Sequence, residues 1–264
     1  MDTKLTGKTR IESDLIGARE IPAEALYGVQ TLRGIENFSI SKFRLSEYPL
    51  FIKGLAITKM AAAMANFELG LLTVEQKDAI IAACGEILDG KHHDQFPVDM
   101  IQGGAGTTTN MNANEVIANR ALELMGHERG EYQYCSPNDH VNCSQSTNDA
   151  YPTAIHIGMY FKHLQLLPHL EELIASFRKK GEEFSQIIKM GRTQLEDAVP
   201  MTLGQTFNGF ASILQDEIAH LNEAAADFLV VNMGATAIGT GICAEPGYAE
   251  KCIAALREIT GWDI

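Results

Sequence analysis

Three segments of this chain concentrate small polar side chains and glycine with little charge. They read IQGGAGTTTNMNANE at residues 101–115, NCSQSTNDAYPT at 142–153 and KMGRTQLEDAVPMTLGQTF at 189–207. Each segment leads into a predicted helix, and helix N-termini carry unpaired N–H groups with about half a positive charge. Hydroxyl and amide groups add hydrogen-bond donors there without adding charge. The pattern therefore predicts a site for an anion such as a carboxylate or a phosphate.

A single segment of this kind would be explained by helix capping alone. Ser146 or Asn148, for example, is a typical N-cap residue in front of a helix. Three such segments in one chain of 264 residues favour a shared anion site, because such a site would explain all of them together.

Other site motifs fail on their details. GGAG at residues 103–106 lacks the Gly-Lys-Ser/Thr of a P-loop, and neither it nor GATAIGTG at 234–241 is a dinucleotide-binding G-x-G-x-x-G turn. The G-x-S-x-G elbow of a hydrolase does not occur in the sequence. KHHD at 91–94 has no second pair of ligands at suitable spacing, so we expect a solvated loop and no metal site. His140 follows Asp139 and could act as a base, although a structural hydrogen bond is the simpler expectation.

Helices must position these segments, because most of the chain carries helical patterns. Residues 55–70 are rich in Ala and Met and end at a glycine, as do residues 73–90 and 112–126. Thr73, with Gln76 three positions later, forms a capping-box pattern at the start of the second of these helices. Alternating strand patterns joined by Asn-Gly or Asp-Gly turns are absent from the sequence, so the predicted fold class is all-α.

Beyond Asp149 the predicted helices become longer, and Pro168 fits the first turn of a new helix. Apolar residues at 3–4 spacing form two stripes, which favour long helices packed as a bundle with the stripes in its core. We expect residues 1–142 to form an N-terminal helical domain and residues 143–264 to form the first part of a central bundle domain. The stripes consist of Leu167, Leu170, Ile174, Phe177, Phe184 and Ile188, and of Leu203, Phe207, Phe210, Leu214, Leu221, Ala225 and Phe228.

Composition limits the classes of function. The chain is 45% hydrophobic with a formal net charge of −13, which argues against nonspecific nucleic-acid binding. Its five cysteines include no C-x-x-C pair, which indicates free thiols in a reducing cytoplasm. The N-terminus lacks the apolar region of a signal peptide, and no apolar run approaches the roughly 18 residues of a membrane span. We therefore expect a cytoplasmic protein with neither a nucleic-acid nor a membrane partner.

The same polar segments resemble the conserved regions of the aspartase/fumarase superfamily. The matching stretches are GGAGTTTNMNANEVIANRALELMG, PNDHVNCSQSTNDAYPTAIHI and GRTQLEDAVPMTLGQTF, and residues 10–41 resemble the N-terminal region of the same proteins. The resemblance covers essentially the whole chain. It implies a small helical N-terminal domain, then a long helical bundle and a C-terminal domain. It also implies a homotetramer in which each active site draws segments from three subunits.

Within the superfamily the chain is most similar to the aspartate ammonia-lyases. Arg19, Ala105, Thr147 and Gln194 favour these enzymes over the fumarases, which usually carry Ser and His in place of Thr147 and Gln194. The resemblance implies the reversible loss of ammonia from L-aspartate to give fumarate, with no required cofactor. Two alternatives stay open. One is a fumarase of the same superfamily, and the other is a noncatalytic protein that binds dicarboxylates or assembles with a companion chain.

The implied chemistry explains why uncharged donors would gather in these segments. A base removes a proton from the carbon beside the β-carboxylate, and that carboxylate becomes a dianionic enediolate. Ser146 and Thr147 match the family positions that hold this carboxylate. Preorganised donors stabilise such growing charge, each by on the order of 3 kcal/mol in comparable oxyanion sites.

The resemblance assigns roles to five further residues. Thr107, Asn148 and Gln194 match positions around the departing amino group. Thr193 matches a position near the α-carboxylate, and Arg19 matches one that helps to hold a substrate carboxylate. Together with the two hydroxyl residues above, these form the predicted substrate-binding set.

The chain also departs from the family pattern. Ser136 replaces the His of a secondary anion site, Thr206 replaces a usual Glu, and Glu196 replaces a common Gln. The family's catalytic base is a serine on a loop reading roughly G-S-S-x-M-P-x-K-x-N-P, and this loop has no match in the sequence. We therefore expect the chain to correspond to the N-terminal part of such a lyase and to end, at Ile264, before the base loop. We expect it to be inactive or nearly so alone, and to self-associate through apolar stripes that later helices would cover.

Overall fold

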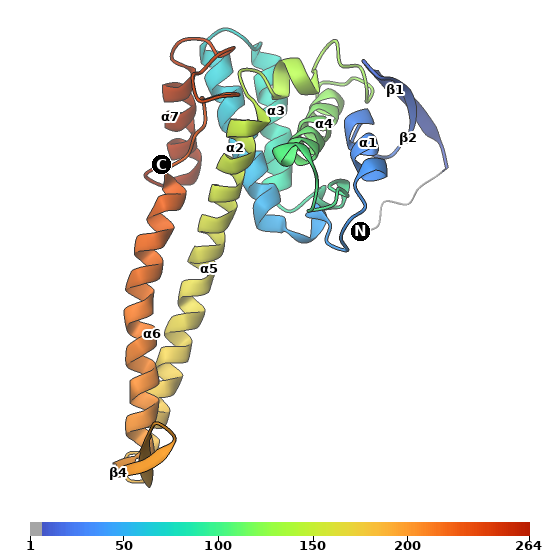
Figure 1. Cartoon of the computed structure of the whole chain (residues 1–264). Helices are drawn as coiled ribbons and strands as arrows, with labels where there is room; N and C mark the ends of the chain where they lie inside the picture. The colour runs from blue at the N-terminus through green and yellow to red at the C-terminus, as the bar shows by residue number, and fades with distance from the viewer. Residues whose placement is uncertain (1–6) are drawn as a thin grey trace. The chain divides into compact units, whose positions relative to one another are not determined.

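The computed structural model describes residues 7–264, which fall into two compact units. The first unit combines residues 7–159 with 229–264, and the second consists of Tyr160–Phe228. Helices dominate both units (Figure 1), which confirms the all-α fold class, although each unit also contains one short β-hairpin. The domain boundary placed between residues 142 and 143 stays a prediction.

The hairpin of the first unit pairs β1 (Thr9–Asp14) with β2 (Gly17–Pro22) in antiparallel orientation. The expectation that strands are absent is wrong for this segment. β1 buries the carboxylate residue Glu12 and leaves Ile11 74% exposed, so it lacks the apolar alternation by which strands are found in a sequence. β2 buries a single apolar residue, Ile21, with the same effect on the pattern.

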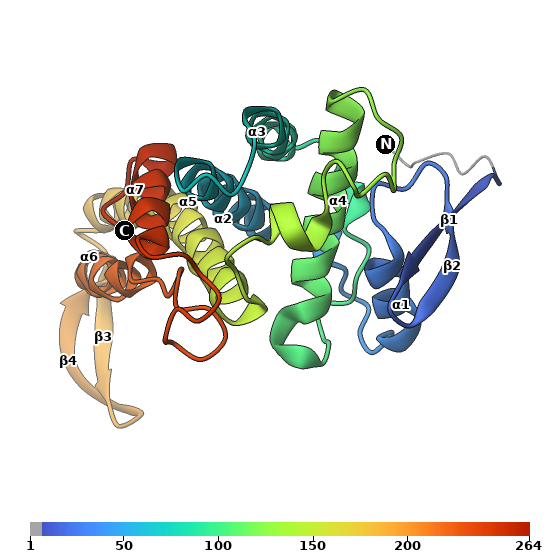
Figure 2. The same cartoon turned by 90° about the horizontal axis from the view of Figure 1, so that it is seen from above.

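Four helices build the core of the first unit. They are α2 (Pro49–Glu68), α3 (Val74–Leu88), α4 (Thr107–Leu124) and α7 (Tyr248–Thr260). α2 packs against both α3 and α7, and α3 packs against α4 (Figure 2). α1 (Val29–Asn37) lies against α4. Burial of each large apolar side chain in these interfaces stabilises the fold by roughly 1.5–3 kcal/mol. The largest buried ones include Ile52, Leu55, Ile80, Ile87, Phe96, Ile117 and Leu122.

The predicted capping box at the start of α3 is confirmed. The Gln76 N–H donates to Thr73 Oγ1 at 3.2 Å, and the Thr73 N–H donates to Gln76 Oε1 at 3.1 Å. The helix stops in front of Gly90, whose φ of +87° favours glycine. α2 and α4 begin earlier than expected, because Pro49 is well suited to a first helical position and because a left-handed turn at Gly106 directs the chain into α4.

α2 is also the one helix among residues 7–264 that is long and apolar enough to cross a membrane, judged by length and composition alone. This apolar stretch of α2 is 67% buried inside the protein. The expectation that no apolar run reaches such a length is therefore wrong for α2. Its contacts with α3 and α7 give it the environment of a core helix.

Short helical turns lie in the connections between these elements. Pro137–Val141 is a π-helical turn just before the segment that leads into the fifth helix, and Gly104–Gly106 is a 3-10 turn that leads into α4. These two turns set how the chain enters two of the polar segments. The other turns are Leu45–Glu47, His93–Gln95 and Asp227–Leu229.

α5 (Thr147–Glu183) is one continuous helix of 37 residues. Its residues up to Met159 belong to the first unit, and the rest belong to the second. The prediction that Pro168 begins a new helix is wrong, because the helix continues through this residue. A proline removes a single N–H donor from a helix, and here the helical turns on both sides of it persist.

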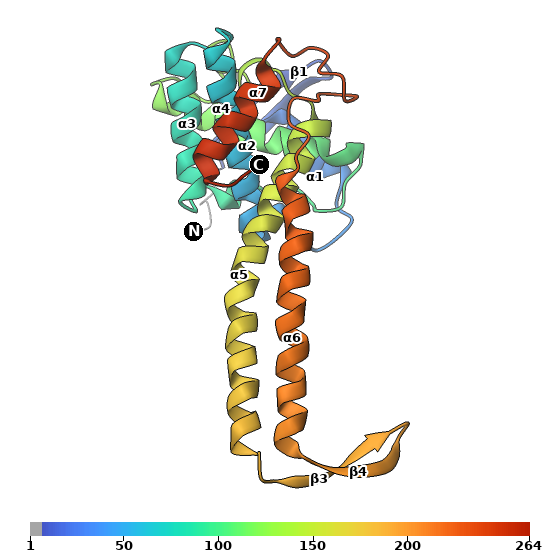
Figure 3. The ribbon, with the colours of Figure 1, turned by 90° about the vertical axis from the view of Figure 1, so that its left-hand side faces the viewer.

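The second unit is a pair of helices joined by a hairpin (Figure 3). Residues 160–183 of α5 run beside α6 (Leu203–Ala226). Between them β3 (Ile188–Thr193) pairs with β4 (Glu196–Thr202) in antiparallel orientation. This second hairpin also corrects the expectation of a strand-free chain. Nearly all of its side chains are exposed, so no buried face marks it in the sequence.

The two helices of the second unit approach closely where glycines face each other. A Cβ atom on Gly204 would lie 2.3 Å from the carbonyl oxygen of Gly181, so this position leaves no room for a side chain. Phe207 packs nearby against Phe177 and Phe184, with ring centroids 6.0 and 5.6 Å apart. These contacts use part of the predicted apolar stripes.

Two residues of the predicted stripes are exposed, whereas Ile174 and Ala225 are buried and the other stripe residues are partly buried. Ile188 was predicted to continue the first stripe, but it lies in β3 and is 77% exposed. Phe210 of the second stripe is 47% exposed. Further exposed apolar residues of these two helices are Leu164, Leu166, Leu173 and Ile213.

Candidate active site

The start of α5 holds the most organised of the polar segments. Ser146 caps the helix, because its Oγ accepts a hydrogen bond from the Asn148 N–H at 3.2 Å. The carboxylate of Asp149 in turn accepts from the Ser146 N–H at 2.9 Å, which completes a reciprocal capping arrangement. Thr147 is the first residue of the helix. The two hydroxyl side chains therefore sit at the positive end of a 37-residue helix.

Both of these hydroxyl groups act as acceptors within the protein. Ser146 Oγ accepts from a backbone N–H, and Thr147 Oγ1 accepts from Asn110 Nδ2 of α4 at 3.2 Å. Neither hydroxyl donates to another group among residues 7–264. Each has one proton to give, so both protons are available to a ligand.

Lys59 lies beneath this segment. It is fully buried in α2, and its Nζ donates to Asn110 Oδ1 at 2.7 Å, to Asn142 Oδ1 at 2.9 Å and to Gln145 Oε1 at 2.8 Å. Burial lowers the pKa of Lys59, and the carboxylate of Asp149 acts in the opposite direction. One of these three partners, Asn110, is also the residue whose side-chain amide donates to Thr147 Oγ1.

Asp149 joins the start of α5 to the GATAIGTG segment. Its Oδ2 accepts from the N–H groups of Gly234 at 3.2 Å and Thr236 at 2.8 Å, and it is fully buried. Asn148 Nδ2 donates to the carbonyl oxygen of Ala237 at 2.8 Å. The segment thus forms one wall of a pocket of about 500 Å³ beside the α5 start. The other wall includes Asn138, Asp139, Asn142, Ser144 and Ser146.

Thr107 begins α4 on the other side of the α5 start. Its Oγ1 donates to the carbonyl oxygen of Gly104 at 2.6 Å, so its oxygen lone pairs stay available while its proton is used. Gly106 precedes it, and a Cβ there would lie 2.5 Å from the Tyr151 ring of α5. Gly106 and Asn148 line a common pocket with Tyr151. The glycine turn thus holds the first and second polar segments close together.

Arg19 lies apart from these groups among its own contacts. It belongs to β2, and its guanidinium pairs with the carboxylate of Glu36 in α1. The arginine is 38% exposed, so this pair leaves part of the guanidinium open to solvent. A contact between Arg19 and the hydroxyl residues of α5 does not occur among the described residues.

Thr193 and Gln194 belong to the second unit, at the tip of the β3–β4 hairpin. The expectation that this polar segment sits at a helix N-terminus is wrong for these two residues, because β4 separates them from α6. Gln194 and Leu195 form the turn with φ values of +50° and +68°. Backbone of this kind is uncommon for residues with side chains, and it persists where surrounding structure or function requires it. Leu195 is 96% exposed, so the tip is presented outward.

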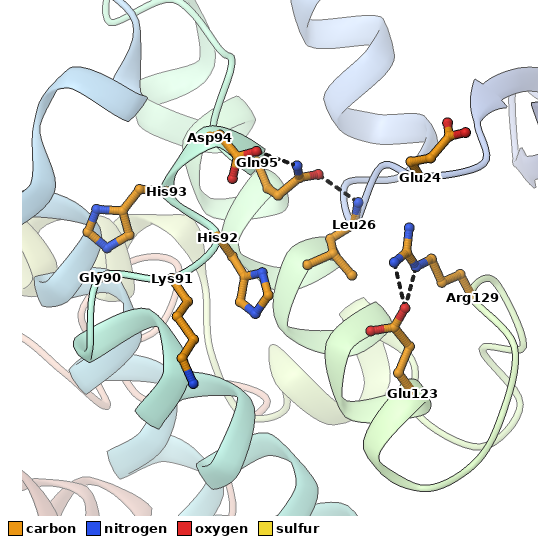
Figure 4. Close-up of a pocket in the computed structure, with 10 residues that line it drawn as sticks. All are labelled: Glu24, Leu26, Gly90, Lys91, His92, His93, Asp94, Gln95, Glu123 and Arg129. Carbon is orange, nitrogen blue, oxygen red and sulfur yellow. Dashed lines mark hydrogen bonds and ion pairs between the residues drawn. The ribbon is translucent and has the colours of Figure 1, made fainter. Parts of the chain in front are cut away.

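A separate pocket contains none of the predicted site residues. It has a volume of about 570 Å³ and is lined by residues of the 90–95 loop together with Glu24, Leu26, Glu123 and Arg129 (Figure 4). His92 pairs with Glu86 at 2.8 Å, and His93 Nε2 lies 2.9 Å from the carbonyl oxygen of Ile87. Groups of three or more metal-ligating side chains are not found among residues 7–264.

His140 is fixed by structural contacts. Its Nδ1 accepts from the Ser136 N–H at 2.8 Å, and its Nε2 lies 3.2 Å from Gln76 Nε2. Burial lowers the pKa of His140, although Asp139 acts in the opposite direction. This is the structural hydrogen bond expected from the sequence.

The first unit thus brings Ser146, Thr147 and Asn148 together on one turn of chain, with the GGAG turn before Thr107 close by. The sequence analysis missed Lys59, Asn110 and the anchoring role of Asp149. The signal for Lys59 was a single charged residue inside the Ala-rich run LAITKMAAAMAN. A charge that a core helix buries requires partners, and here they come from elements far away in the sequence.

Comparisons with known proteins agree with this architecture. The family model described as lyase matches residues 17–263. The aspartate ammonia-lyase of Pseudomonas canavaninivorans is 56% identical over 253 residues, which cover 96% of this chain and 53% of that protein. The aspartate ammonia-lyase of Escherichia coli strain K12 is 53% identical over 259 residues, which cover 98% of this chain and 54% of that protein.

Solved structures show the same fold. The cobalt-bound crystal structure of fumarate lyase:delta crystallin from Brucella melitensis matches with a TM-score of 0.95 at 52% identity, covering 97% of this chain and 56% of that one. The class II fumarase of Schistosoma mansoni matches with a TM-score of 0.90 at 36% identity, covering 96% of this chain and 53% of that one. The chain spans about half the length of the curated relatives it matches. Family match, identity and fold together show that this chain belongs to the lyase family of the aspartase/fumarase superfamily, as a homologue of the aspartate ammonia-lyases.

Proposed function

We propose that this chain supplies part of the active site of a carbon–nitrogen lyase, which reversibly converts L-aspartate to fumarate and ammonia. One observation carries the proposal. Ser146 and Thr147 lie side by side at the start of α5, each accepts a hydrogen bond inside the protein, and each keeps its own proton for a ligand. An arrangement of uncharged donors at a helix N-terminus suits a carboxylate that gains negative charge.

The chemistry makes that charge the main difficulty. Removal of the proton beside the β-carboxylate turns this carboxylate into a dianionic enediolate, and the amino group then leaves as ammonia. On this proposal the two hydroxyl protons and the α5 dipole stabilise the oxygens where the charge grows. They need no reorganisation during the reaction, because Asn110 and the Asn148 N–H already fix the hydroxyl oxygens.

The groups proposed for the amino end of the substrate have the opposite hydrogen-bond polarity. Thr107 uses its proton on Gly104, and Asn148 uses an amide proton on Ala237. Both therefore offer oxygen lone pairs, which suit an ammonium group that can only donate. Gln194 is proposed for the same end of the substrate, Thr193 for the α-carboxylate and Arg19 for a substrate carboxylate.

We propose that copies of the chain combine these groups in a homotetramer. The strained and outward-facing tip that carries Gln194 suits insertion into a site on another copy. The proposed base is the serine of the family loop, for which residues 1–264 contain no match. On this proposal the chain has the donor groups and depends on a further segment for the base. Its five free thiols fit the cytoplasm, which we propose as its compartment.

The direct test is an assay of ammonia release from L-aspartate. The 264-residue chain is assayed alone and after mixing with the half of the Escherichia coli relative that it does not match. We expect little turnover by the chain alone and turnover in the mixture, because only the mixture contains the proposed base loop. We call the preparation that converts substrate the active form. Robust turnover by the chain alone would contradict the missing-base proposal.

The fumarase alternative rests on the structural match to a class II fumarase. The identity to that protein is 36%, which is lower than the 53–56% shared with the aspartate ammonia-lyases. Hydration of fumarate by the active form, without ammonia release from aspartate, would establish this alternative.

If the mixture shows neither a change of oligomeric state nor activity, the proposal that a companion segment completes the site is wrong.

A further inference from the structure

The buried lysine beneath the α5 start has a consequence for the direction of the hydrogen bonds in the site. Lys59 is fully buried on a helix whose other buried residues are mostly apolar or alanine. An apolar side chain such as methionine would fill this position without the desolvation penalty of a buried charge. Packing alone therefore does not account for the lysine.

The chemistry of the ammonium group fixes the orientation of three amides. An ammonium has three protons to donate and no lone pair to accept with. Because it contacts Asn110, Asn142 and Gln145 at 2.7–2.9 Å, each of these side chains must turn its oxygen toward Nζ. Their NH2 groups are consequently turned away from the lysine.

The NH2 groups of Asn110 and Gln145, which point away from Lys59, donate to residues at and just before the start of α5. Asn110 Nδ2 donates to Thr147 Oγ1, so Thr147 is an acceptor inside the protein and a donor outside. Gln145 Nε2 donates to the carbonyl oxygens of Val141 and Cys143 at 2.9 and 3.0 Å, which holds the chain just before α5. If the side-chain amide of Asn110 were flipped, its oxygen would accept a hydrogen bond from the Thr147 hydroxyl. The hydroxyl could then no longer donate to a ligand.

We propose that Lys59 is a positioning residue that, through Asn110, directs the Thr147 proton toward the substrate carboxylate. The proposal rests on the function proposed above, and it adds a reason why the site needs a charged residue that never touches the substrate. Asp149, Cys84 and Cys252 are the titratable groups near the ammonium. Burial raises the pKa of both thiols to about 12, so the carboxylate is its charged neighbour.

The decisive variant is Asn110→Asp. A carboxylate at this position still accepts from Lys59, but it presents an oxygen to Thr147 Oγ1 and accepts a hydrogen bond from the hydroxyl. We expect kcat of the active form to fall about 100-fold, the loss typical of one oxyanion donor, with KM within about 3-fold of the wild type. Lys59→Met should act in the same direction, because it removes the donor that orients both Asn110 and Asn142, whose Oδ1 also accepts from Asn110 Nδ2 at 3.1 Å.

A double-mutant cycle separates positioning from general damage. In a Thr147→Val background there is no hydroxyl to direct. Adding Asn110→Asp or Lys59→Met to this variant should therefore lower kcat by less than about a further 3-fold. A substitution that damages folding would instead lower kcat by the same factor in the Thr147→Val background as in the wild type. Thr58→Val is the matched control, because Thr58 is equally buried next to Lys59 and donates only within its own helix, to Gly54 at 2.8 Å. It should keep wild-type kcat.

A second measurement needs no turnover. In the 264-residue chain labelled with 15N-asparagine, the Asn110 side-chain amide is identified by its loss in Asn110→Asp. We expect its protons to exchange with water at least 10-fold faster in Lys59→Met than in the wild type or in Thr58→Val. Unchanged exchange in Lys59→Met, or unchanged kcat in Asn110→Asp, would overturn the proposal.

The kinetic cycle uses whichever of aspartate or fumarate the wild-type active form converts. If aspartate fails and fumarate is hydrated, the proposed function is wrong while the positioning role is still tested. If aspartate is converted and the cycle is additive, the positioning role is wrong while the proposed function stands.

Discussion

In the proposed function, the hydroxyl groups of Ser146 and Thr147 bind the β-carboxylate of the substrate through uncharged donors. A lysine or arginine would stabilise the substrate carboxylate strongly before the reaction begins. Preorganised neutral donors favour the dianionic state, in which each oxygen carries more charge, and that difference is what accelerates the reaction. We propose that Lys59 orients one of these donors, Thr147, through the side-chain amide of Asn110.

Ser146→Ala tests the two roles of one hydroxyl. The variant should lose about 1 kcal/mol of stability, because the α5 start loses its cap, and kcat of the active form should fall about 100-fold. Thermal unfolding measures the first effect and ammonia release measures the second. Ser146→Thr keeps a hydroxyl and should retain most of both, and a Thr variant as damaged as the Ala variant would contradict this role.

At the scale of elements, Asp149 connects the α5 start to the GATAIGTG segment. Its carboxylate accepts three backbone N–H groups, from Ser146, Gly234 and Thr236. A buried N–H without a partner costs about 1–3 kcal/mol, so this one side chain contributes strongly to the stability of the pocket wall beside Ser146.

Asp149→Ala should lower the free energy of unfolding by about 3 kcal/mol, because it leaves these N–H groups unpaired. Urea denaturation measures the change. Asp216→Ala is the control, because Asp216 is exposed on α6 and its loss should stay within about 0.5 kcal/mol. Equal effects of the two substitutions would rule out the anchoring role of Asp149.

α3 and α4 are joined by an ion pair whose contribution should depend on pH. Arg120 donates to both carboxylate oxygens of Glu86, at 2.6 and 2.8 Å, and this lowers the pKa of Glu86 to about 2. A carboxyl whose pKa is lowered by folding stabilises the protein above its unfolded pKa, and the contribution is lost as pH falls toward the folded value.

The stability difference between wild type and Glu86→Gln should therefore be about 1 kcal/mol at pH 6 and shrink between about pH 5 and pH 2. Urea denaturation at a series of pH values measures it. Lys180 pairs with Glu183 on the exposed part of α5, so Glu183→Gln serves as the control and should show a smaller difference. A Glu86→Gln difference that stays constant down to pH 2 would show that the pair does not act this way.

Local signals explain which elements could be predicted. The capping box of α3 and the polar start of α5 depend on residues within three or four positions of each other. The partners of Lys59 lie 51, 83 and 86 positions away, and no local pattern indicates them. The hairpins were missed because β1 buries a glutamate and because β3 and β4 bury almost nothing.

At the scale of the whole molecule, the second unit leaves apolar side chains uncovered. Phe210, Ile213 and Leu173 are 47%, 61% and 42% exposed, and they lie on the two long helices. Surfaces of this kind favour association, and another copy of the same helices is the partner that the proposed homotetramer would supply.

The 264-residue chain should consequently self-associate, with a mass by light scattering that rises with concentration. Ile213→Glu should weaken the association, because it places a charge within the apolar face. Val74→Glu is a matched control, since Val74 is also exposed, by 57%, but lies on α3 of the first unit. A concentration-independent monomer would contradict the bundle interpretation.

The central claim is that uncharged hydroxyl protons at the start of α5 stabilise the enediolate. It is tested most directly by kcat for ammonia release from L-aspartate in the active form, compared between the wild type, Thr147→Ser and Thr147→Val. We predict that Thr147→Val, which keeps the shape and loses the proton, lowers kcat about 100-fold, while Thr147→Ser stays within about 10-fold of the wild type. A Thr147→Val enzyme with wild-type kcat would contradict the claim.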